Sequence, residues 1–510
     1  MILDRRTLLK LTAASGAALA MGGAPRAFSA ASSDTLRIGL STYPAHLKPW
    51  VNVGYAGQLV SSLINRFLMA YTPDGKLVGE LAESFERDGD RSWIVKLKDA
   101  KFSNGQPVTS ADVEWNIEKI KAEGSGASTR DSMLDVEKVD IVDERTFKLM
   151  TKLPNAALPA LFANPFLQII AKGSTDTEDH GIGAGPFTLT NAEKGVGFDF
   201  EASPHYFKSG LPTFKKARVT AYADENLRVA AITAGDVDVI DYVPWSAMDQ
   251  LEKDANVKLE TVATGAFMFL SFNGAGVFKD ARLRRAVALA IRREEIVNGV
   301  FFGRGAVLGG VPRSQTTPYY NAELANGQTY DPDKAKALIK EAGAEGVTVN
   351  LLSTAQYGMH RDTAVIVQGH LAEVGINVTL TMPDWSTRVT MGNRGQGDFA
   401  VQGLGLETFD PDAASSLIDP TLSPTFFRSR NFEVPGLTEL LAKGRAEFDL
   451  EKRKAIYAQV DKLVIEYTPF CGLSYRATGF AHLNQVKDFH MLPDQISPFS
   501  GRLFDELSIS

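Results

Sequence analysis

Short strand-like segments alternate with amphipathic helical segments along most of this chain, and this alternation limits the fold more than any other feature. A helix is expected over residues 331–343, with Asp331 as its cap, a proline at its first position and a glycine at its end. A second helix is expected over residues 363–374, and a single glycine separates it from a strand over residues 376–380. A helix that leads through a short glycine turn into a strand predicts an α/β fold.

The chain begins with a pattern typical of an export signal. Basic residues that include the adjacent Arg5 and Arg6 precede a short apolar run over residues 11–21, and small residues near 29–31 provide a cleavage region. The apolar run is shorter than the roughly 18 residues that cross a bilayer, which disfavours the alternative of an uncleaved membrane anchor. We therefore predict that residues 1–31 are a twin-arginine-type signal peptide and that the mature chain is periplasmic.

The mature chain is acidic and has no disulfide. The whole sequence has a formal net charge of −7, and residues 1–31 carry four basic and one acidic side chain, so their removal leaves −10. This charge disfavours nucleic acid or anionic lipid as a partner. The only cysteine, Cys471, is interpreted as a buried packing residue. The seven histidines show no paired metal-ligand spacing, so neither a metal site nor another cofactor is predicted.

The sequence contains no recognisable catalytic motif. Residues 181–186 are rich in glycine, but no helix pattern follows them, and residues 303–318 lack the Gly-Lys-Ser/Thr ending of a nucleotide-binding loop. A nucleophile elbow, a paired catalytic motif and a zinc signature are all missing from the sequence. We predict that the protein is not an enzyme. The alternative from another class is a secreted α/β hydrolase whose serine, histidine and acid meet only in the fold.

Several segments, in the same order along the chain, resemble the large extracytoplasmic solute-binding proteins of bacterial ABC importers. This is the dipeptide-, oligopeptide- and nickel-binding class, family 5. The likeness extends over essentially the whole mature chain, and no single segment is decisive alone. The segments that carry it are residues 79–85 (GELAESF), 93–97 (WIVKL), 101–113 (KFSNGQPVTSADV), 183–187 (GAGPF), 203–207 (SPHYF), 270–273 (LSFN), 285–291 (RAVALAI) and 330–336 (YDPDKAK).

The resemblance implies a two-lobed periplasmic-binding-protein fold of type II, the large class with an extra subdomain, and a ligand cleft between the lobes. The first lobe is expected to contain residues 32–262 and 479–510, with the subdomain inserted at approximately 50–190, and the second lobe residues 263–478. The lobes would close over a small-molecule or short-peptide ligand. A monomer that delivers its ligand to ABC permease subunits in the membrane is expected.

The strongest candidate for ligand binding is Glu407. In peptide-binding members of the family, a carboxylate that follows a glycine–aromatic pair holds the α-ammonium group of the ligand. The matching stretch is residues 403–412, in which Gly403, Leu404 and Gly405 lead to Glu407 in the place of the usual aspartate. Leucine replaces the usual aromatic residue and the acid is one methylene longer, so the pocket is expected to differ in depth. Alternatively, Glu407 pairs with an arginine of its own lobe.

The resemblance indicates further candidates in the second lobe. Trp385 corresponds to an aromatic residue that lines the pocket in relatives, although a tryptophan of the core is the rival interpretation. Some dipeptide binders hold a carboxylate with an arginine in the loop before the helix predicted at 363–374. Here that loop contains Tyr357 but no arginine at the aligned position, and Arg361 is the nearest substitute. Asp410 is included as a candidate, although bracing of the Asp-Pro turn is its more expected role.

The loop with Tyr43, Ala45 and His46 matches the segment that relatives lay across the cleft from the first lobe. Together these residues predict a peptide or an amino-acid-derived solute as the ligand. An opine or oligosaccharide remains an alternative, because the expected arginine and aromatic residue are missing. A nickel complex is another alternative, with His46 and His360 as its candidate contacts.

Overall fold

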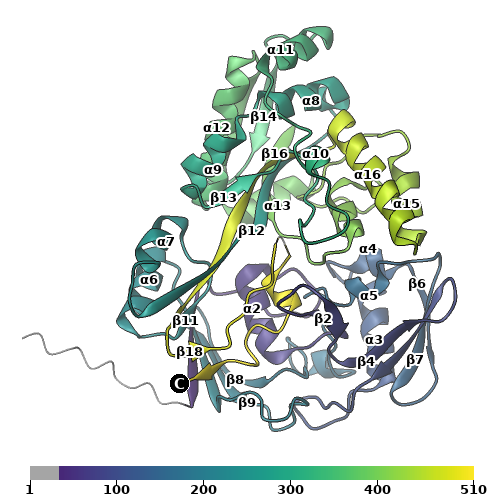
Figure 1. Ribbon diagram of the computed structural model, residues 1–510, viewed down its shortest axis with the longest axis vertical. Coiled ribbons are helices and arrows are strands. Elements are labelled where there is room, and N and C mark those ends of the chain that lie inside the picture. Colours follow the sequence, from purple (N-terminus) through teal and green to yellow (C-terminus); the bar gives the residue numbers. More distant parts are fainter. Residues whose placement is uncertain (1–33, 495) are drawn as a thin grey trace, which may run out of the picture.

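The computed structural model describes residues 34–494 and 496–510. Its largest sheet contains eleven strands, which are β1 (Thr35–Leu40), β8 (Phe187–Glu193), β9 (Gly197–Ala202), β10 (Lys216–Ala221), β11 (Val239–Ile240), β12 (Val257–Phe272), β13 (Gly305–Val307), β14 (Thr348–Leu352), β15 (Asn377–Thr381), β16 (Phe399–Leu404) and β17 (Phe470–Leu483). Their order is β15-β14-β16-β12-β17-β11-β1-β10-β9-β8, and β13 pairs with β17. The predicted mixed α/β fold with two lobes is confirmed (Figure 1). The predicted signal peptide lies outside the described residues.

Two long antiparallel strands, β12 and β17, run from one lobe into the other (Figure 1). At one end β17 pairs with β11, and at the other end β12 pairs with β16 from Phe267 to Phe272. The pairing of β12 with β17 shifts register between Val262 and Ala266, opposite Thr478 and Arg476. We propose this irregularity as the junction of the lobes, and the division at 262/263 and 478/479 stays a prediction.

The first lobe is built on the β8–β11 half of the sheet. Its helices are α2 (Gly54–Ile64), α6 (Glu225–Ala234) and α7 (Trp245–Leu251). The C-terminal segment returns to this lobe with β18 (Val486–Lys487) and β19 (Ser508–Ile509), which pair with each other. Phe480, Phe499 and Phe504 are buried in the same apolar cluster as Leu36 and Ile38 of β1. Burial of these side chains is the physical reason that the two ends of the chain share one core.

The inserted subdomain has a sheet of its own. Its elements are β2 (Met69–Tyr71), β3 (Leu77–Gly79), β4 (Ala82–Arg87), β5 (Ser92–Leu97), α3 (Ser110–Lys121), α4 (Arg130–Met133), β6 (Val136–Ile141), β7 (Thr146–Thr151) and α5 (Leu158–Leu161), with the sheet order β4-β5-β7-β6. A capping box opens α3, because Thr109 and Asp112 each accept a backbone N–H of the other. Alternate side chains of β5 (Trp93, Val95 and Leu97) face the buried core, as period two requires.

The second lobe combines parallel strands with many helices. Its helices are α8 (Ala281–Ala290), α9 (Arg293–Phe301), α10 (Ala322–Ala325), α11 (Pro332–Glu341), α12 (Gly358–Glu373), α13 (Trp385–Asn393), α14 (Ser415–Ile418), α15 (Leu437–Ala446) and α16 (Leu450–Tyr467). The Asp331 cap of α11 is confirmed, because its carboxylate accepts the N–H of Lys334. Helix α12 begins at Gly358, five residues before the predicted start. Its first turn stays helical because His360 is buried against the lobe.

The arginines in and around α8 and α9 have two kinds of partner. Arg292 is partly exposed and binds Glu373. Arg284 and Arg293 are buried and donate to backbone carbonyls. These carbonyls lie at the end of α16 and in β17, so the arginines satisfy backbone acceptors that a purely apolar side chain would leave unpaired. Within the described residues, no helix is both long and apolar enough to cross a membrane.

Candidate ligand-binding site

Glu407 lies just after β16 in a segment held against the C-terminal part of the chain. The preceding residue, Leu406, forms a β-bridge with Ile496, and its carbonyl accepts the N–H of Ser497 at 2.8 Å. The hydroxyl of Ser500 donates to the backbone carbonyl of Glu407, also at 2.8 Å. These contacts fix the backbone of the glutamate between the second lobe and a segment that belongs to the first lobe.

The carboxylate of Glu407 is enclosed without a partner. The residue as a whole keeps some exposure, but its Oε2 is shielded from solvent and receives no hydrogen bond. Among the described residues no basic side chain forms an ion pair with it. Burial raises the pKa of the Glu407 carboxyl from 4.5 to about 8. An acid in this position gains strongly from a cationic group that enters beside it.

Aromatic side chains form a wall near the glycine that opens this segment. The ring centroids of Tyr357 and Trp385 are 5.3 Å apart, and those of Trp385 and His360 are 5.6 Å apart. A Cβ atom added at Gly403 would lie 3.4 Å from Nε2 of His360 and 2.8 Å from Sδ of Met268. Glycine at this position therefore allows β16 to pass close under the imidazole. Leu404 packs in a separate apolar cluster beside β12, and Gly405 is partly buried.

His360 is a neutral residue of this wall. Its side chain is buried, and its Nδ1 has no hydrogen-bond partner in the described residues. Burial, together with the nearby charges of Arg388 and Arg476, lowers the pKa of His360 to about 3. A neutral imidazole can donate one hydrogen bond and accept another, so it suits a polar group of a ligand.

Two buried arginines, Arg388 and Arg476, lie near His360, and the sequence analysis did not identify either. The Nη2 of Arg388 donates to the carbonyl of Val401 at 2.6 Å and to Oε1 of Gln402 at 2.5 Å. Arg476 lies on β17 beside the register shift between β12 and β17. No local pattern in the sequence marks these residues, because the groups around them come from distant segments.

Two residues of the first lobe complete this region. The Nη1 of Arg476 donates to the hydroxyl of Tyr242 at 2.8 Å, and that hydroxyl lies 3.4 Å from Sδ of Met359 on α12. Tyr242 adopts φ of 47°, a backbone conformation that is unusual for a bulky residue. The ring of Tyr55 packs edge-on to Tyr242 at 5.3 Å. Tyr55 and Tyr242 therefore place the first lobe in contact with Arg476 and α12.

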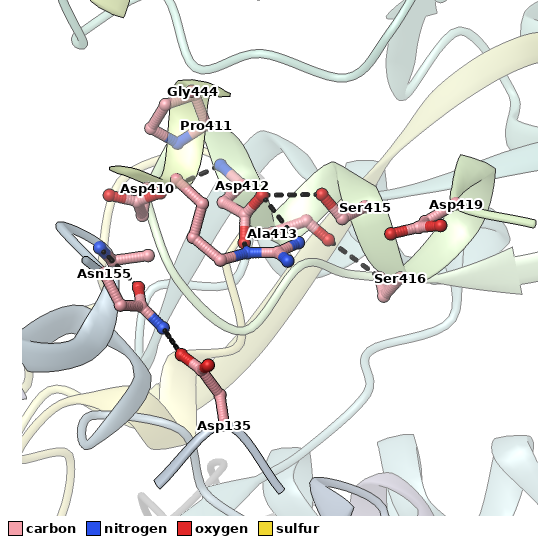
Figure 2. A network of polar contacts seen from close by, with 12 residues as sticks. Asp135, Asn155, Asp410, Pro411, Asp412, Ala413, Ser415, Ser416, Asp419 and Gly444 are labelled. Carbon is pink, nitrogen blue, oxygen red and sulfur yellow. Dashed lines mark hydrogen bonds and ion pairs between the residues drawn. The ribbon is translucent and has the colours of Figure 1, made fainter. Parts of the chain in front are cut away.

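The structure places Arg361 and Asp410 in ion pairs of their own. Arg361 is about half exposed, at 51%, and its Nε binds the neighbouring Asp362 at 2.8 Å. Asp410 binds Arg453 of α16 and accepts the N–H of Asp412, so it braces the turn after Glu407. Figure 2 shows this turn facing the subdomain, where Asn155 donates to Asp135. The charges of Arg361 and Asp410 are therefore already balanced by Asp362 and Arg453, without a ligand.

The predicted loop of the first lobe packs largely onto that lobe. The ring of Tyr43 stacks on Phe198 with a centroid distance of 4.8 Å. Ala45 is exposed, and His46 is partly buried with an unpartnered Nδ1. No contact in the described residues joins these three side chains to Glu407 or Trp385, so their part in ligand binding stays a prediction.

Two cavities lie away from the residues above. One of about 660 Å³ lies at the outer ends of β12 and β17, where Lys258, His482 and His490 contribute to its lining. A smaller one of about 110 Å³ lies beside Tyr475 and Asp494. The buried, unpartnered charges indicate a binding site more strongly, because they require a ligand or a counter-charge, whereas an open groove does not. Within residues 34–494 and 496–510, no three His, Cys, Asp or Glu side chains are grouped to hold a metal ion.

Comparison with known proteins identifies the family. Residues 76–421 match the model of the bacterial extracellular solute-binding proteins, family 5. The chain belongs to this family, and it is accordingly a solute-binding component of an ABC importer and not an enzyme. The resemblance stated from the sequence is thereby confirmed.

Individual relatives span nearly the whole chain. The probable D,D-dipeptide-binding periplasmic protein DdpA of Escherichia coli K12 is 27% identical over 96% of both chains. The glutathione-binding protein GsiB of Shigella dysenteriae is 24% identical over 86% of this chain and 88% of its own. The periplasmic binding protein AgaA from A. tumefacien R10, solved with agropinic acid, is 33% identical and superposes with a TM-score of 0.87. That match covers 93% of this chain and 99% of AgaA.

Proposed function

We propose that the protein captures a peptide or amino-acid-derived solute that carries an ammonium group, and that Glu407 binds this group as the lobes close. The single observation behind this proposal is the enclosed carboxylate without a counter-charge. Closure would bury the ligand, and the membrane permease would then receive it from the closed form. The protein would act as a monomer in the periplasm after export through its twin-arginine signal.

The energetics of Glu407 support a cationic ligand group. A buried carboxylate is costly unless a positive charge or several hydrogen-bond donors compensate it. The rival interpretation was an ion pair with an arginine of the same lobe, and the described residues contain no such pair. An ammonium group that enters the closed cleft would supply the missing charge in surroundings where water does not screen it.

Contacts between the lobes support a mechanism based on closure. Asp131 of the subdomain accepts both the N–H and the hydroxyl of Ser423 in the second lobe, each at 2.9 Å. The N–H of Ala156 donates to the carbonyl of Arg445 at 2.8 Å. Such contacts exist only while the lobes are together, so a ligand that binds both lobes shifts the population toward this form by its differential affinity.

One relative, AgaA, favours the opines among the alternative ligand classes. AgaA is 33% identical, and its structure contains agropinic acid, an opine. Leu404 also stands where an aromatic residue was expected, so an aromatic contact of the peptide-binding members is missing here. We therefore include opines among the amino-acid-derived solutes to be tested.

Native mass spectrometry of the purified protein, followed by calorimetric titration of the solute that it retains, tests the proposal. Glu407→Gln should weaken binding of an ammonium-bearing solute by about 2–5 kcal/mol, because a buried charge pair is lost. Glu433→Gln is the matched control, since Glu433 is exposed in the same lobe. Equal affinity of the wild type and Glu407→Gln would reject the role of Glu407. A retained solute that leaves the protein chemically changed would reject solute binding as the function.

A further inference from the structure

The buried charges around His360 are not balanced by acids of this chain. Arg388 is 1% exposed and Arg476 is 6% exposed. Neither forms an ion pair with a carboxylate within the described residues. Arg313 and Arg453 are buried elsewhere in the protein and pair with acids. Arg284 and Arg293 are also buried without an acid, but they donate to backbone carbonyls. The two arginines near His360 differ from both sets, because each leaves a buried N–H group without an acceptor.

Arg388 keeps hydrogen-bonding capacity unused. Its Nη2 is bound to Val401 and Gln402, whereas Nε and Nη1 are buried and receive no acceptor. The guanidinium lies 4.9 Å from the ring centroid of Trp385 and 5.2 Å from that of Phe426. The two rings hold the planar guanidinium in place, but they offer no hydrogen-bond acceptor in its plane. The unbound N–H groups therefore remain available to a ligand.

Arg476 occupies the junction of the lobes with a second free donor. Its Nη1 is bound to Tyr242, and its Nε is buried without an acceptor. The guanidinium lies 5.7 Å from the ring centroids of both Tyr242 and Trp245. Its charge affects the pKa of Tyr55 in the first lobe and of His360 in the second. Arg476 therefore faces the region where both lobes meet.

The other charged and polar groups around this region do not neutralise the arginines. His360 is held neutral, so it adds no negative charge. Asp241, near Tyr55, accepts the hydroxyl of Ser41 at 3.0 Å, but it forms no ion pair with Arg476 in the described part of the chain. Glu407 likewise forms no ion pair within the described residues. No acid of the described chain therefore pairs with either arginine.

We propose that Arg388 and Arg476 form an anion subsite, with His360 between them, that binds a carboxylate of the transported solute. This inference rests on the proposed solute-binding function and specifies its ligand as an acidic or zwitterionic amino-acid derivative. Arginine binds a carboxylate through charge-assisted hydrogen bonds, and such bonds are strongest in a site that excludes water. The unused Nε and Nη1 of Arg388 do not share an edge of the guanidinium, because Nη1 lies cis to Cδ. Each of them can donate a single hydrogen bond to a carboxylate oxygen.

The two subsites divide the recognition of a ligand. The arginines take its carboxylate, whereas Glu407 takes its ammonium group or another donor. A solute that lacks the carboxylate leaves two buried arginines unpaired on closure, and this penalty selects against it. The arginine expected before α12 from the resemblance is thus replaced by arginines from α13 and β17.

Titration calorimetry with matched ligands tests the anion subsite. The probes are the dipeptide Met-Leu, glutathione and agropinic acid, each compared with the derivative whose carboxyl groups are amidated. The variants are Arg388→Gln and Arg476→Gln, with Arg388→Lys and Arg476→Lys to retain the charge. Arg394→Gln is the control, because Arg394 is exposed on the same lobe. Circular dichroism and the thermal midpoint establish that each variant is folded.

The expected result is at least one acid that binds the wild type about 10-fold or more tightly than its amide. Each glutamine variant should lose about 10- to 100-fold in affinity for the acid and less than 3-fold for the amide. The lysine variants should recover part of the loss, and Arg394→Gln should show none. If a glutamine variant is unfolded, the affinities of the corresponding lysine variant for the acid and for the amide are compared instead.

Other outcomes would overturn the subsite. Equal losses for acid and amide would indicate a purely structural role of the arginines, and unchanged affinity for the acid would exclude contact with it. Failure of all three acids to bind the wild type would also reject the subsite. Native mass spectrometry separates this failure from that of the proposed function, because a neutral or cationic solute retained by the protein would leave solute binding intact. Retention of no solute would count against both.

Discussion

Arg453 holds Asp410 through two parallel contacts, Nη1 to Oδ2 at 2.7 Å and Nη2 to Oδ1 at 2.8 Å. The arginine projects from α16, and the aspartate begins the turn that follows Glu407. The pair is nearly buried, with side-chain exposures of 6% and 11%. A bidentate contact in these surroundings fixes the position of the turn, and with it the backbone that carries the proposed ammonium-binding carboxylate.

Asp410→Ala should lower the free energy of unfolding by about 3–5 kcal/mol, because it leaves Arg453 buried without its counter-charge. Urea denaturation monitored by circular dichroism measures this change. Glu451→Ala is the control and should change stability by less than about 1 kcal/mol, since the pair of Glu451 with Lys454 is exposed. A similar loss in both variants would show that the Asp410 pair has no special role.

The stability of the ligand-free protein should depend on the ionisation of Glu407. Its pKa is raised by burial from 4.5 to about 8, so the folded state binds the proton more tightly than the unfolded state. The free energy of unfolding should therefore fall as the pH rises from about 4.5 to about 8. In Glu407→Gln this contribution should be lost, which denaturation curves measured across the pH range can show. Identical pH profiles for the two proteins would contradict the raised pKa.

Binding of an ammonium-bearing solute at pH 7 should release up to about one proton. Glu407 is mostly protonated in the free protein at this pH, and a cation beside it favours the ionised form. Calorimetry in phosphate and in Tris should give different binding enthalpies, and the difference reports the number of protons released. The difference should be small in Glu407→Gln. Equal enthalpies in both buffers for the wild type would mean that Glu407 does not change its ionisation.

Asp131→Ala should favour the open form, because it removes the two hydrogen bonds to Ser423. Both partners lie at the surface, so we expect less than about 1 kcal/mol of change in stability but about 2- to 10-fold faster release of a bound solute. Stopped-flow fluorescence and small-angle scattering measure release and opening. Asp140→Ala serves as the control, since Asp140 pairs only with Lys138 of its own subdomain. Unchanged release in Asp131→Ala would exclude a role in closure.

Replacement of Arg5 and Arg6 by lysines should abolish export, because the adjacent arginines are the recognised feature of the twin-arginine signal. Fractionation of bacterial cells that express the full-length chain, followed by immunoblotting, gives the periplasmic fraction. Replacement of Lys10 by arginine should leave export unchanged. A normal periplasmic yield of the double lysine variant would refute the twin-arginine route.

The Asp331 cap was predicted correctly from the sequence, because it depends on atoms within three residues of each other. The start of α12 was predicted too late, because burial of His360 by the rest of the lobe extends the helix toward its N-terminus. The burial of Arg284 and Arg293 likewise depends on distant segments, since their acceptors come from other strands and helix ends.

The candidate site shows the same difference between what neighbouring residues indicate and what distant segments decide. Glu407, Trp385 and Tyr357 were chosen as candidates from the sequence, because ordered segments that resemble a family indicate individual positions, and their part in binding stays a prediction. Arg388 and Arg476 could not be chosen in this way, and Arg361 was chosen as the substitute, although the structure pairs it with Asp362. Nothing near these residues in the chain distinguishes an arginine that pairs with a neighbouring acid from one that is buried without an acid.

The sequence by itself determined the α/β class, the family and the position of the carboxylate, because periodicity, caps and motif order are properties of neighbouring residues. The tertiary structure alone decided which charges remain unpaired. Arg476 and Tyr242 are 234 positions apart, yet their side chains meet at 2.8 Å where two long strands join the lobes. Whether a buried charge has a partner depends on which distant segments pack around it, and that information exists only in the folded chain.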